Sequence, residues 1–240
     1  MEEARNIPAL PLSWSQLRDE TLTEELHDLI AHDQRIKHLE LSIRVDGRVA
    51  HVEGKVGSEE ERQRIRKLLR RQGSLYAVWD LLTLPDQQLA VADIGCGGQK
   101  QIQWACGIDR LSYPGVDVVT DLEAPLPFGD DTFDHIFAVH VLEHIADLLG
   151  LMHELYRILR PTGVLHILVP NWRHVNAVAD PTHIRFMDTQ TFKYFCQSRL
   201  GVLPWQPLII TASDDTVFAD LQPLKDGSTP ADSQIARWFY

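Results

Sequence analysis

Short apolar runs separated by glycine and acidic residues dominate residues 89–240. Runs of this length are typical of buried strands. They lie at 89–94, 105–108, 118–120 and 133–139. A longer stretch, 141–160, repeats apolar residues at helical spacing and predicts a helix, and 163–169 predicts a fifth strand. Strands that alternate with connections in this way indicate an α/β protein with a parallel sheet.

The rest of this region predicts one more helix and a hairpin. Asp188 and Thr189 begin a helix that is expected to run through Arg199. Two strands follow, at 204–211 and 217–224, and Ser213-Asp214-Asp215 supplies the turn between them. The tail after Asp226 ends in aromatic residues, and its pattern does not decide between a fold over a cleft and a partner contact.

A different pattern occupies the first 88 residues and predicts a small α+β domain at 15–84. The expected order is helix, strand, strand, helix, strand. The elements are a helix at 15–36, strands at 38–45 and 48–56 joined at Asp46-Gly47, a helix at 58–73 and a strand at 75–84. Residues 1–14 are expected to be an N-terminal tail, 85–88 a short linker, and 89–240 a second, larger domain.

Composition restricts the function classes. The formal net charge is −11, and most of it falls in residues 89–240, which argues against nucleic acid as a partner. The three cysteines show no metal-site spacing and indicate reduced thiols. We find no secretory signal and no apolar run long enough to span a bilayer, so we expect a cytoplasmic protein without a transmembrane segment.

Polar and glycine residues end the predicted strands in the order expected for a nucleotide-like cofactor. The first strand stops at Asp93-Ile94-Gly95-Cys96-Gly97, where glycine lets the chain turn and a ligand approach. Asp109 ends the second strand and can accept both hydroxyls of a ribose. Asp121 and Leu122 follow the third strand, where a carboxylate and a backbone N–H can hold an adenine. His140 ends the fourth strand.

This series resembles the class I S-adenosylmethionine-dependent methyltransferases, in particular the type 11 group. Further matching residues are Pro125-Leu126-Pro127-Phe128, Phe133-Asp134, Val141-Leu142-Glu143-His144 and Leu159-Arg160-Pro161-Thr162-Gly163. The resemblance implies a doubly wound, Rossmann-like sheet that is parallel with a final antiparallel hairpin. It implies S-adenosyl-L-methionine as cofactor. The implied cofactor-binding residues are Asp93, Gly95, Cys96, Gly97, Asp109, Asp121, Leu122 and His140.

One departure from the family lies directly after the glycine turn. Most members have a full helix there, whereas only eleven residues separate Gly97 from Asp109. A helix N-terminus commonly anchors the anionic end of a ligand, so its loss bears on the cofactor's carboxylate. Lys100 is the residue that could compensate. The turn also lacks the third glycine of the GxGxxG dinucleotide-binding motif, because position 100 is Lys. This argues against a dinucleotide-dependent oxidoreductase.

The N-terminal domain resembles a BON domain over roughly residues 22–84. The residues that carry the likeness include Ile43-Arg44-Val45-Asp46-Gly47, Val52-Glu53-Gly54-Lys55-Val56 and Val78-Trp79-Asp80-Leu81-Leu82. Such domains are associated with membrane surfaces and protein contacts. The basic face of the helix at 58–73 suits an anionic surface, but its glutamates favour a solvated face. We expect this domain to serve self-association or a protein contact.

Methyl transfer to a hydroxyl or amine needs a base, which histidine can supply near neutral pH. The candidates are His140 and the loop residues Asp180 and His183. Residues placed at the same edge and expected to bind the acceptor are His144, Trp172, Arg173 and Arg185. Asp180, His183 and His174 match no standard zinc spacing, so we expect Asp180 and His183 to hydrogen-bond each other and no metal to bind.

The sequence therefore predicts an S-adenosylmethionine-dependent methyltransferase with a small-molecule or glycan acceptor. The alternative is a catalytically silent scaffold that keeps the fold and binds partners through its N-terminal domain. The shortened connection after Gly97 favours the scaffold, and the retained Gly95, Asp109 and Asp121 favour the enzyme.

Overall fold

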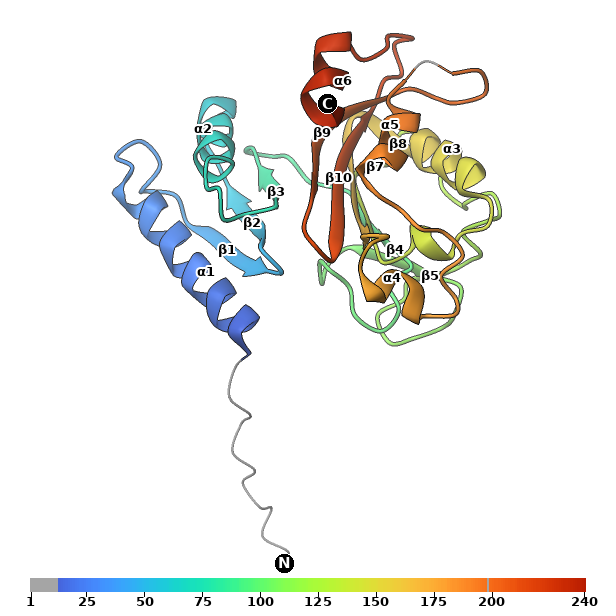
Figure 1. Ribbon diagram of the computed structural model, residues 1–240. Helices are drawn as coiled ribbons and strands as arrows, with labels where there is room; N and C mark the ends of the chain where they lie inside the picture. Colours follow the sequence, from blue (N-terminus) through green and yellow to red (C-terminus); the bar gives the residue numbers. More distant parts are fainter. Residues whose placement is uncertain (1–12, 198) are drawn as a thin grey trace, which may run out of the picture. The chain divides into compact units, whose positions relative to one another are not determined.

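A computed structural model describes residues 13–197 and 199–240 (Figure 1). The chain divides after Gln87 into two compact units, which are described separately. Most of the expected N-terminal tail, residues 1–12, lies outside the described residues. No helix in the described part of the chain is long and apolar enough to cross a membrane.

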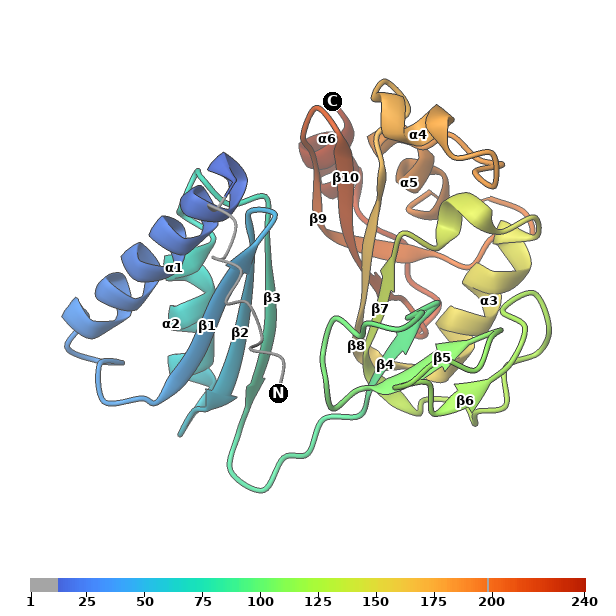
Figure 2. The ribbon, with the colours of Figure 1, turned by 90° about the horizontal axis from the view of Figure 1, so that it is seen from below.

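The first unit is a three-stranded sheet with both helices on one face (Figure 2). Its elements are α1 (Trp14–His32), β1 (Leu41–Asp46), β2 (Val49–Lys55), α2 (Glu59–Leu69) and β3 (Ala77–Thr83). β1 and β2 form an antiparallel hairpin, and β3 pairs in parallel with β2. The predicted order of helix, strand, strand, helix and strand is confirmed.

Local sequence explains these boundaries. Ser13 caps α1 in a capping box, and the Ser58 side chain accepts the backbone N–H of Glu61 at the start of α2. Gly47 and Arg48 have φ values of 56° and 64°, the conformation of a tight two-residue hairpin turn. α1 ends at His32, before the predicted end at 36, because the chain is extended at Asp33.

The second unit is built on a seven-stranded sheet with the order β6-β5-β4-β7-β8-β10-β9. The strands are β4 (Val91–Ile94), β5 (Cys106–Asp109), β6 (Val118–Val119), β7 (Phe133–Val139), β8 (Leu159–Pro170), β9 (Trp205–Ala212) and β10 (Thr216–Pro223). The first five are parallel, and the β9–β10 hairpin is antiparallel to β8. The predicted Rossmann-like sheet with a final antiparallel hairpin is confirmed.

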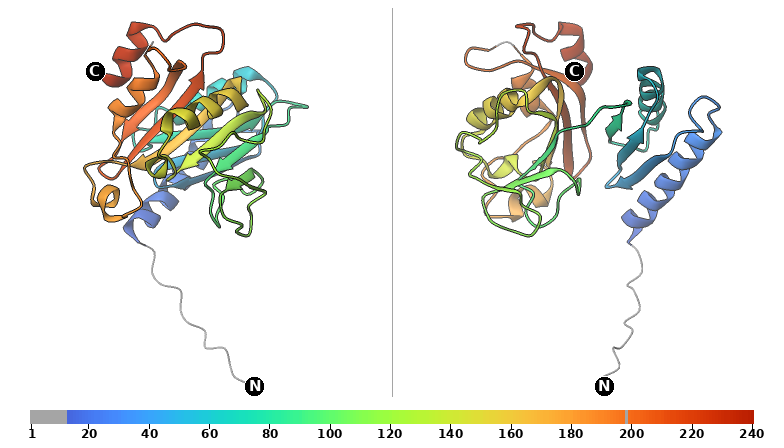
Figure 3. Two further views of the ribbon diagram at one scale, coloured as in Figure 1. Left: turned by 90° about the vertical axis from the view of Figure 1, so that its right-hand side faces the viewer. Right: turned by 180° about the vertical axis from the view of Figure 1, so that it is seen from behind.

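Apolar residues of this sheet and of three helices form one core. Figure 3 shows the ribbon of this unit from two further sides. The helices of this unit are α3 (Leu148–Ile158), α4 (Val175–Ala179), α5 (Thr189–Phe195) and α6 (Asp232–Phe239). Alternate β8 residues Leu165, Ile167 and Val169 point into this core, together with Leu155 of α3. Because strand side chains alternate, one shared core places α3, α5 and α6 on the same sheet face.

The predicted helix over 141–160 is wrong at both ends. Residues Leu142–His144 form a 3₁₀ turn, α3 begins only at Leu148 with Asp147 as its N-cap, and β8 begins at Leu159. Tertiary partners take the backbone groups that a continuous helix would use. The Glu123 carboxylate accepts the N–H groups of Ala146 and Asp147. The predicted helix 188–199 is also shorter and ends at Phe195.

No helix connects β4 to β5, as the sequence indicated. Residues 95–105 instead form turns held by side chains. Lys100 donates through Nζ to the carbonyl of Ala105 at 2.8 Å and to the carboxylate of Asp117 at 3.1 Å. Asp117 also accepts the N–H of Gly107 at 2.7 Å. Lys100 therefore stabilises the short connection between β4 and β5. The sequence had suggested the carboxylate of the cofactor as its partner.

Candidate functional site

A hollow of about 510 Å³ opens where the parallel strands of the second unit end. The sheet order reverses here, since β4 has β5 on one side and β7 on the other, and such a switch point is the usual ligand site in open α/β sheets. Six residues expected to bind the cofactor line the hollow: Gly95, Gly97, Asp109, Asp121, Leu122 and His140. The tertiary structure thus brings four strand ends to one place.

Both glycines of the turn after β4 have left-handed backbone conformations, with φ of 61° at Gly95 and 54° at Gly97. A Cβ on Gly95 would lie 2.6 Å from the Val141 Cγ2, so no side chain fits there. A Cβ on Gly97 would meet nothing within 4 Å and would project into open space. The first glycine is thus needed for packing and conformation, and the second leaves room beside the hollow.

Asp109 is positioned by the turn that it faces. Its two carboxylate oxygens accept the N–H groups of Gly97 and Leu111, each at 2.9 Å. Asp121 accepts the N–H of Glu123 at 3.0 Å and is exposed. Both carboxylates stand at the mouth of the hollow with Glu123, against the single arginine Arg110. This lining favours a ligand that carries positive charge.

Asp93 and Cys96 lie behind the hollow and do not line it. Burial raises the pKa of Asp93 to about 7, against the opposing effect of the Gln101 N–H, which the carboxylate accepts. Burial, reinforced by the charges of Asp93 and Asp109, raises the pKa of the Cys96 thiol to about 11. Cys96 therefore stays protonated near neutral pH and is unsuited to act as a nucleophile.

His140 follows β7 directly and holds an uncommon left-handed backbone with φ of 55°. Its side chain is half exposed, and Nδ1 lies 3.2 Å from Oε1 of Glu143. An ionised carboxylate can only accept, so the ring donates from Nδ1 and leaves Nε2 as its basic atom. A non-glycine residue in this conformation at a ligand edge is a common mark of function.

The loop between α4 and α5 reaches the same edge through its backbone. The N–H groups of Ile184 and Arg185 both bond to the carbonyl of Glu143, at 3.0 and 3.1 Å. This pairing brings His183 beside His144, with ring centroids 4.8 Å apart. His144 and Thr182 line the hollow, so the loop forms part of its wall.

The side chains of Asp180 and His183 do not form the predicted hydrogen bond, although the backbone N–H of His183 donates to the carbonyl of Asp180 at 3.2 Å. The nearest oxygen of Asp180 is 3.9 Å from Nε2 of His183, which is beyond hydrogen-bonding distance. Asp180 instead accepts the N–H and the hydroxyl of Thr182, at 2.8 and 2.6 Å, and these bonds lower its pKa. Its short side chain closes a local turn because Thr182 is nearer than the imidazole.

The other three residues expected to bind the acceptor are Trp172, Arg173 and Arg185, and their surroundings differ. Arg185 donates to the carbonyl of Ile145 at 2.6 Å and also to that of Ala146, so its guanidinium is occupied by the chain itself. Trp172 is half exposed and carries the guanidinium of Arg173 over its ring, 5.3 Å from the centroid. Neither of these two residues lines the hollow.

Several residues that line the hollow were not singled out from the sequence. They are Arg110, Leu111, Tyr113, Glu123, Ile145 and Thr182. The first three follow Asp109 directly, so their place after a strand end was a usable signal. Thr182 lies in the loop that carries the predicted candidates Asp180 and His183, and long-range backbone bonds bring that loop to the hollow. Ile145 directly follows His144.

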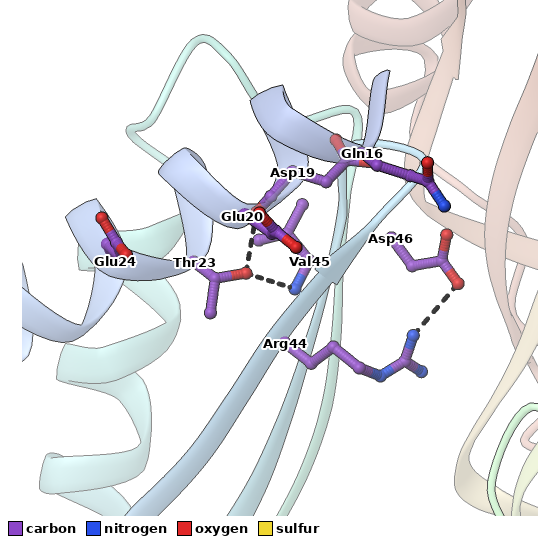
Figure 4. A pocket seen from close by; sticks show the side chains of 8 residues that line it. All are labelled: Gln16, Asp19, Glu20, Thr23, Glu24, Arg44, Val45 and Asp46. Carbon is purple, nitrogen blue, oxygen red and sulfur yellow. Dashed lines mark hydrogen bonds and ion pairs between the residues drawn. The ribbon is translucent and has the colours of Figure 1, made fainter. Parts of the chain in front are cut away.

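A second hollow, of about 450 Å³, lies between α1 and β1 of the first unit (Figure 4). Its polar side chains are largely used to join helix and hairpin. Thr23 accepts the N–H of Val45 at 3.0 Å, and Asp19 accepts the N–H of Gly47 at 2.8 Å. Arg44 pairs with Asp46. These contacts describe a structural junction.

Three arginines on α2 are paired within the unit. Arg64 pairs with Asp33 at 2.6 Å, and Arg62 pairs with Glu59 at 3.2 Å. Arg66 pairs with Asp80. These pairs reduce the positive charge that this part of the helix offers to an anionic surface.

Comparisons with known proteins agree with the geometry of the first hollow. The family described as a methyltransferase domain matches residues 92–167, from β4 into β8. A probable S-adenosylmethionine-dependent methyltransferase of Mycolicibacterium smegmatis is 37% identical over 62 residues, which are 26% of this chain and 24% of that protein. Methyltransferase GfsG of Streptomyces halstedii is 32% identical over 100 residues, covering 32% and 36% of the two chains.

The shared region is limited to part of each relative. The chain spans roughly a quarter to a third of the lengths of these curated relatives, 24% and 36%. A solved S-adenosylmethionine-dependent methyltransferase from Aquifex aeolicus aligns over 55% of this chain and 82% of its own, with 16% identity and a TM-score of 0.42. Residues 92–167 match a methyltransferase domain, and that match together with the relatives implies S-adenosylmethionine as the cofactor.

Proposed function

We propose that this chain is an S-adenosylmethionine-dependent methyltransferase whose acceptor is a hydroxyl or an amine of a small molecule or glycan. The observation that carries the proposal is the hollow at the switch point of the sheet. It gathers the glycine turn after β4, Asp109, the Asp121-Leu122 pair and His140. In this arrangement Asp109 holds the ribose, Asp121 and Leu122 hold the adenine, and the turn faces the methionine part.

The charge of the hollow supports this cofactor. S-adenosylmethionine carries a sulfonium and an ammonium group, and the lining holds Asp109, Asp121 and Glu123 against Arg110. The shortened connection after β4 offers no helix N-terminus for the cofactor's carboxylate, and the N–H groups of Cys96 and Gly97 in the turn are already donated to Ile108 and Asp109.

His140 is the proposed base. The acceptor oxygen or nitrogen loses its proton to Nε2 of His140 and attacks the methyl carbon, while the carbon–sulfur bond breaks and its electron pair stays on sulfur. The product is a neutral thioether, and no other reactant is needed. Glu143 orients the ring through Nδ1 and stabilises the imidazolium that forms. The remaining task is to position the acceptor and to exclude water.

The other site residues have supporting roles in this proposal. Asp180 shapes the acceptor loop through Thr182, and His183 stands beside His144 at the wall of the hollow. Trp172 and Arg173 offer an exposed stacked pair near the end of β8 for acceptor recognition. Arg185 acts by holding the loop to residues 145–146.

The first unit is proposed to be a BON-like module that serves self-association or a protein contact and takes no part in the chemistry. The protein is proposed to act in the cytoplasm, where free thiols such as Cys96, Cys106 and Cys196 remain reduced. A catalytically silent scaffold is the second candidate, and the helix-free connection between β4 and β5 favours it.

Calorimetric titration with S-adenosylhomocysteine tests the proposal. Asp109→Ala should weaken binding by about 10- to 150-fold, because charged hydrogen bonds contribute roughly 1.5–3 kcal/mol. Asp28→Ala, which removes the same charge from the exposed face of α1, should leave the affinity unchanged. Asp109→Asn keeps one acceptor for the turn and controls for unfolding. Absence of binding to the folded wild-type chain would favour the scaffold and reject the enzyme.

A further inference from the structure

A buried carboxylate and two imidazoles meet at the wall of the hollow. Glu143, His144 and His183 each offer a ligand atom, and these atoms all lie within 4.8 Å of one another. The three residues come from the 3₁₀ turn after β7 and from the loop between α4 and α5. This set differs from Asp180, His183 and His174, the group that the sequence brought to attention.

The Glu143 carboxylate is buried, and only one of its two oxygens has a hydrogen-bond partner among the described residues. Its side chain is only 2% exposed, and its Oε1 accepts from His140. Its second oxygen, Oε2, is buried and has no hydrogen-bond partner among the described residues. A buried carboxylate oxygen without a partner is costly, typically about 1–3 kcal/mol or more, so a cation beside it would be stabilising.

Both histidines hold the tautomer that metal binding requires. The Nδ1 of His183 lies 3.1 Å from the carbonyl of Ala177, and the Nδ1 of His144 lies 3.2 Å from the carbonyl of Thr182. A carbonyl only accepts, so each ring donates from Nδ1 and keeps the lone pair on Nε2. Imidazoles that bind metals are commonly oriented by such an outer bond to a backbone carbonyl.

The positions of the three ligands are set by the backbone and not by chance contacts of mobile side chains. Glu143 and His144 are neighbours in one turn, and the carbonyl of Glu143 accepts two N–H groups of the loop that carries His183. Thr182 adds its hydroxyl as an acceptor for His144 Nδ1 at 3.1 Å. The site is therefore largely formed before an ion arrives.

We propose that Glu143, His144 and His183 bind a divalent transition-metal ion at the acceptor side of the hollow. Two imidazole nitrogens and one carboxylate oxygen suit first-row ions such as Mn²⁺, Co²⁺ or Zn²⁺, whereas Ca²⁺ and Mg²⁺ prefer oxygen ligands throughout. Three protein ligands leave coordination positions free, as in catalytic sites. His144 lines the hollow, so those positions are within reach of an acceptor there.

The inference deepens the proposed methyl transfer and rests on it only for the role of the ion. A hydroxyl bound to the ion loses its proton more easily, and His140, on the other oxygen of Glu143, is placed to take that proton. In this arrangement Oε1 of Glu143 accepts from His140, and Oε2 of the same carboxylate binds the metal ion.

Titration of the metal-free, untagged full chain with Zn²⁺ and separately with Mn²⁺ tests the site. We expect one equivalent to bind. His144→Asn and His183→Asn should each weaken binding by about 100-fold or more, since even outer partners of a metal site are worth roughly 10–100-fold. Glu143→Gln should do the same. His174→Asn, which keeps the cap of α4, should bind as the wild type does.

Two results would overturn the site: no saturable binding of either ion by the folded wild-type chain, or equal affinity in His144→Asn and the wild type. His144 is exposed, so its variant keeps the test valid if Glu143→Gln fails to fold by circular dichroism. S-adenosylhomocysteine binding is measured on the same samples. Cofactor binding without metal binding rejects the metal site alone, and metal binding without cofactor binding rejects the proposed methyltransferase alone.

Discussion

Three residues near the strand ends of the second unit have conformations or surroundings that are uncommon in folded proteins. Gly95 has no room for a Cβ, and His140 holds a left-handed backbone. The buried Oε2 of Glu143 has no hydrogen-bond partner in the part of the chain that the structure describes. Each feature is uncommon in a residue selected for stability alone. All three lie around one hollow, which connects them to ligand binding.

Asp93 gives a prediction for pH dependence at this scale. Burial raises its pKa from the ordinary value of 3.8 to about 7 in the folded chain. The folded state therefore binds a proton more tightly, and stability falls as the pH rises from about 4 to about 7. Asp93→Asn removes this dependence. Relative to the wild type, the variant should gain roughly 4 kcal/mol between pH 4 and pH 8, at about 1.4 kcal/mol for each pKa unit.

Urea unfolding at several pH values measures this difference. The sign is fixed by the direction of the pKa shift: the variant must gain on the wild type toward alkaline pH. Parallel stability curves for the two proteins would show that Asp93 ionises normally in the fold, and the burial argument would then be wrong.

At the scale of elements, the connection between β4 and β5 replaces a helix with side-chain bonds. Lys100 ties residues 100–105 to Asp117, and Asp117 in turn holds the N–H of Gly107. The N–H of Gly107 and the ammonium of Lys100 together lower the pKa of Asp117. A few charged hydrogen bonds thus hold the connection between β4 and β5 in the place of a helix.

Lys100→Met should destabilise the connection between β4 and β5. The loss of two charged hydrogen bonds is expected to cost about 1.5–3 kcal/mol in unfolding free energy and to weaken S-adenosylhomocysteine binding. Lys67→Met, on the exposed face of α2, is the matched control and should leave both quantities unchanged. Chemical denaturation and calorimetry report the two effects. If Lys100→Met is as stable as the control, the connection is held by packing and not by these bonds.

The loop of residues 180–186 is the second element whose role depends on tertiary bonds. It has little regular structure, but its backbone is fixed to Glu143 and its arginine to residues 145–146. The same bonds interrupt the helix that the apolar pattern predicted at 141–160. One set of contacts therefore both ends a helix and completes the wall of the hollow.

For the whole molecule, the two units have separate hydrophobic cores. One contains Leu26, Val52 and Ile65, and the other contains Ile94, Leu155 and Ile167. The residues that line the main hollow all belong to the second unit. Each core is large enough to support folding of its own unit.

A shortened chain that begins at Pro85 should therefore fold and bind S-adenosylhomocysteine with an affinity within about threefold of the full chain, a difference under roughly 1 kcal/mol. Circular dichroism and calorimetry on both chains check this. A shortened chain that folds but does not bind would make the first unit part of the site.

Local pattern determined much of this protein. The β7 strand at 133–139, the hairpin at Asp46-Gly47 and the final antiparallel pair follow from runs and turns that need no distant partner. The glycine turn and Asp109 were predictable for the same reason. Parallel strands end at one edge, so residues that follow each strand can be placed together without knowing the packing.

Only the tertiary structure decided which side chains meet. Glu143, His144 and His183 converge because a loop pairs its backbone with a carbonyl far away in the sequence. Asp180 turns to Thr182, and Lys100 and Arg185 are occupied by the chain itself. Long-range bonds also determine where α3 begins. Glu123 accepts the N–H groups of Ala146 and Asp147, and Arg185 donates to the carbonyl of Ile145. Periodicity reports a preference for helix, but long-range hydrogen bonds determine where the helix can begin.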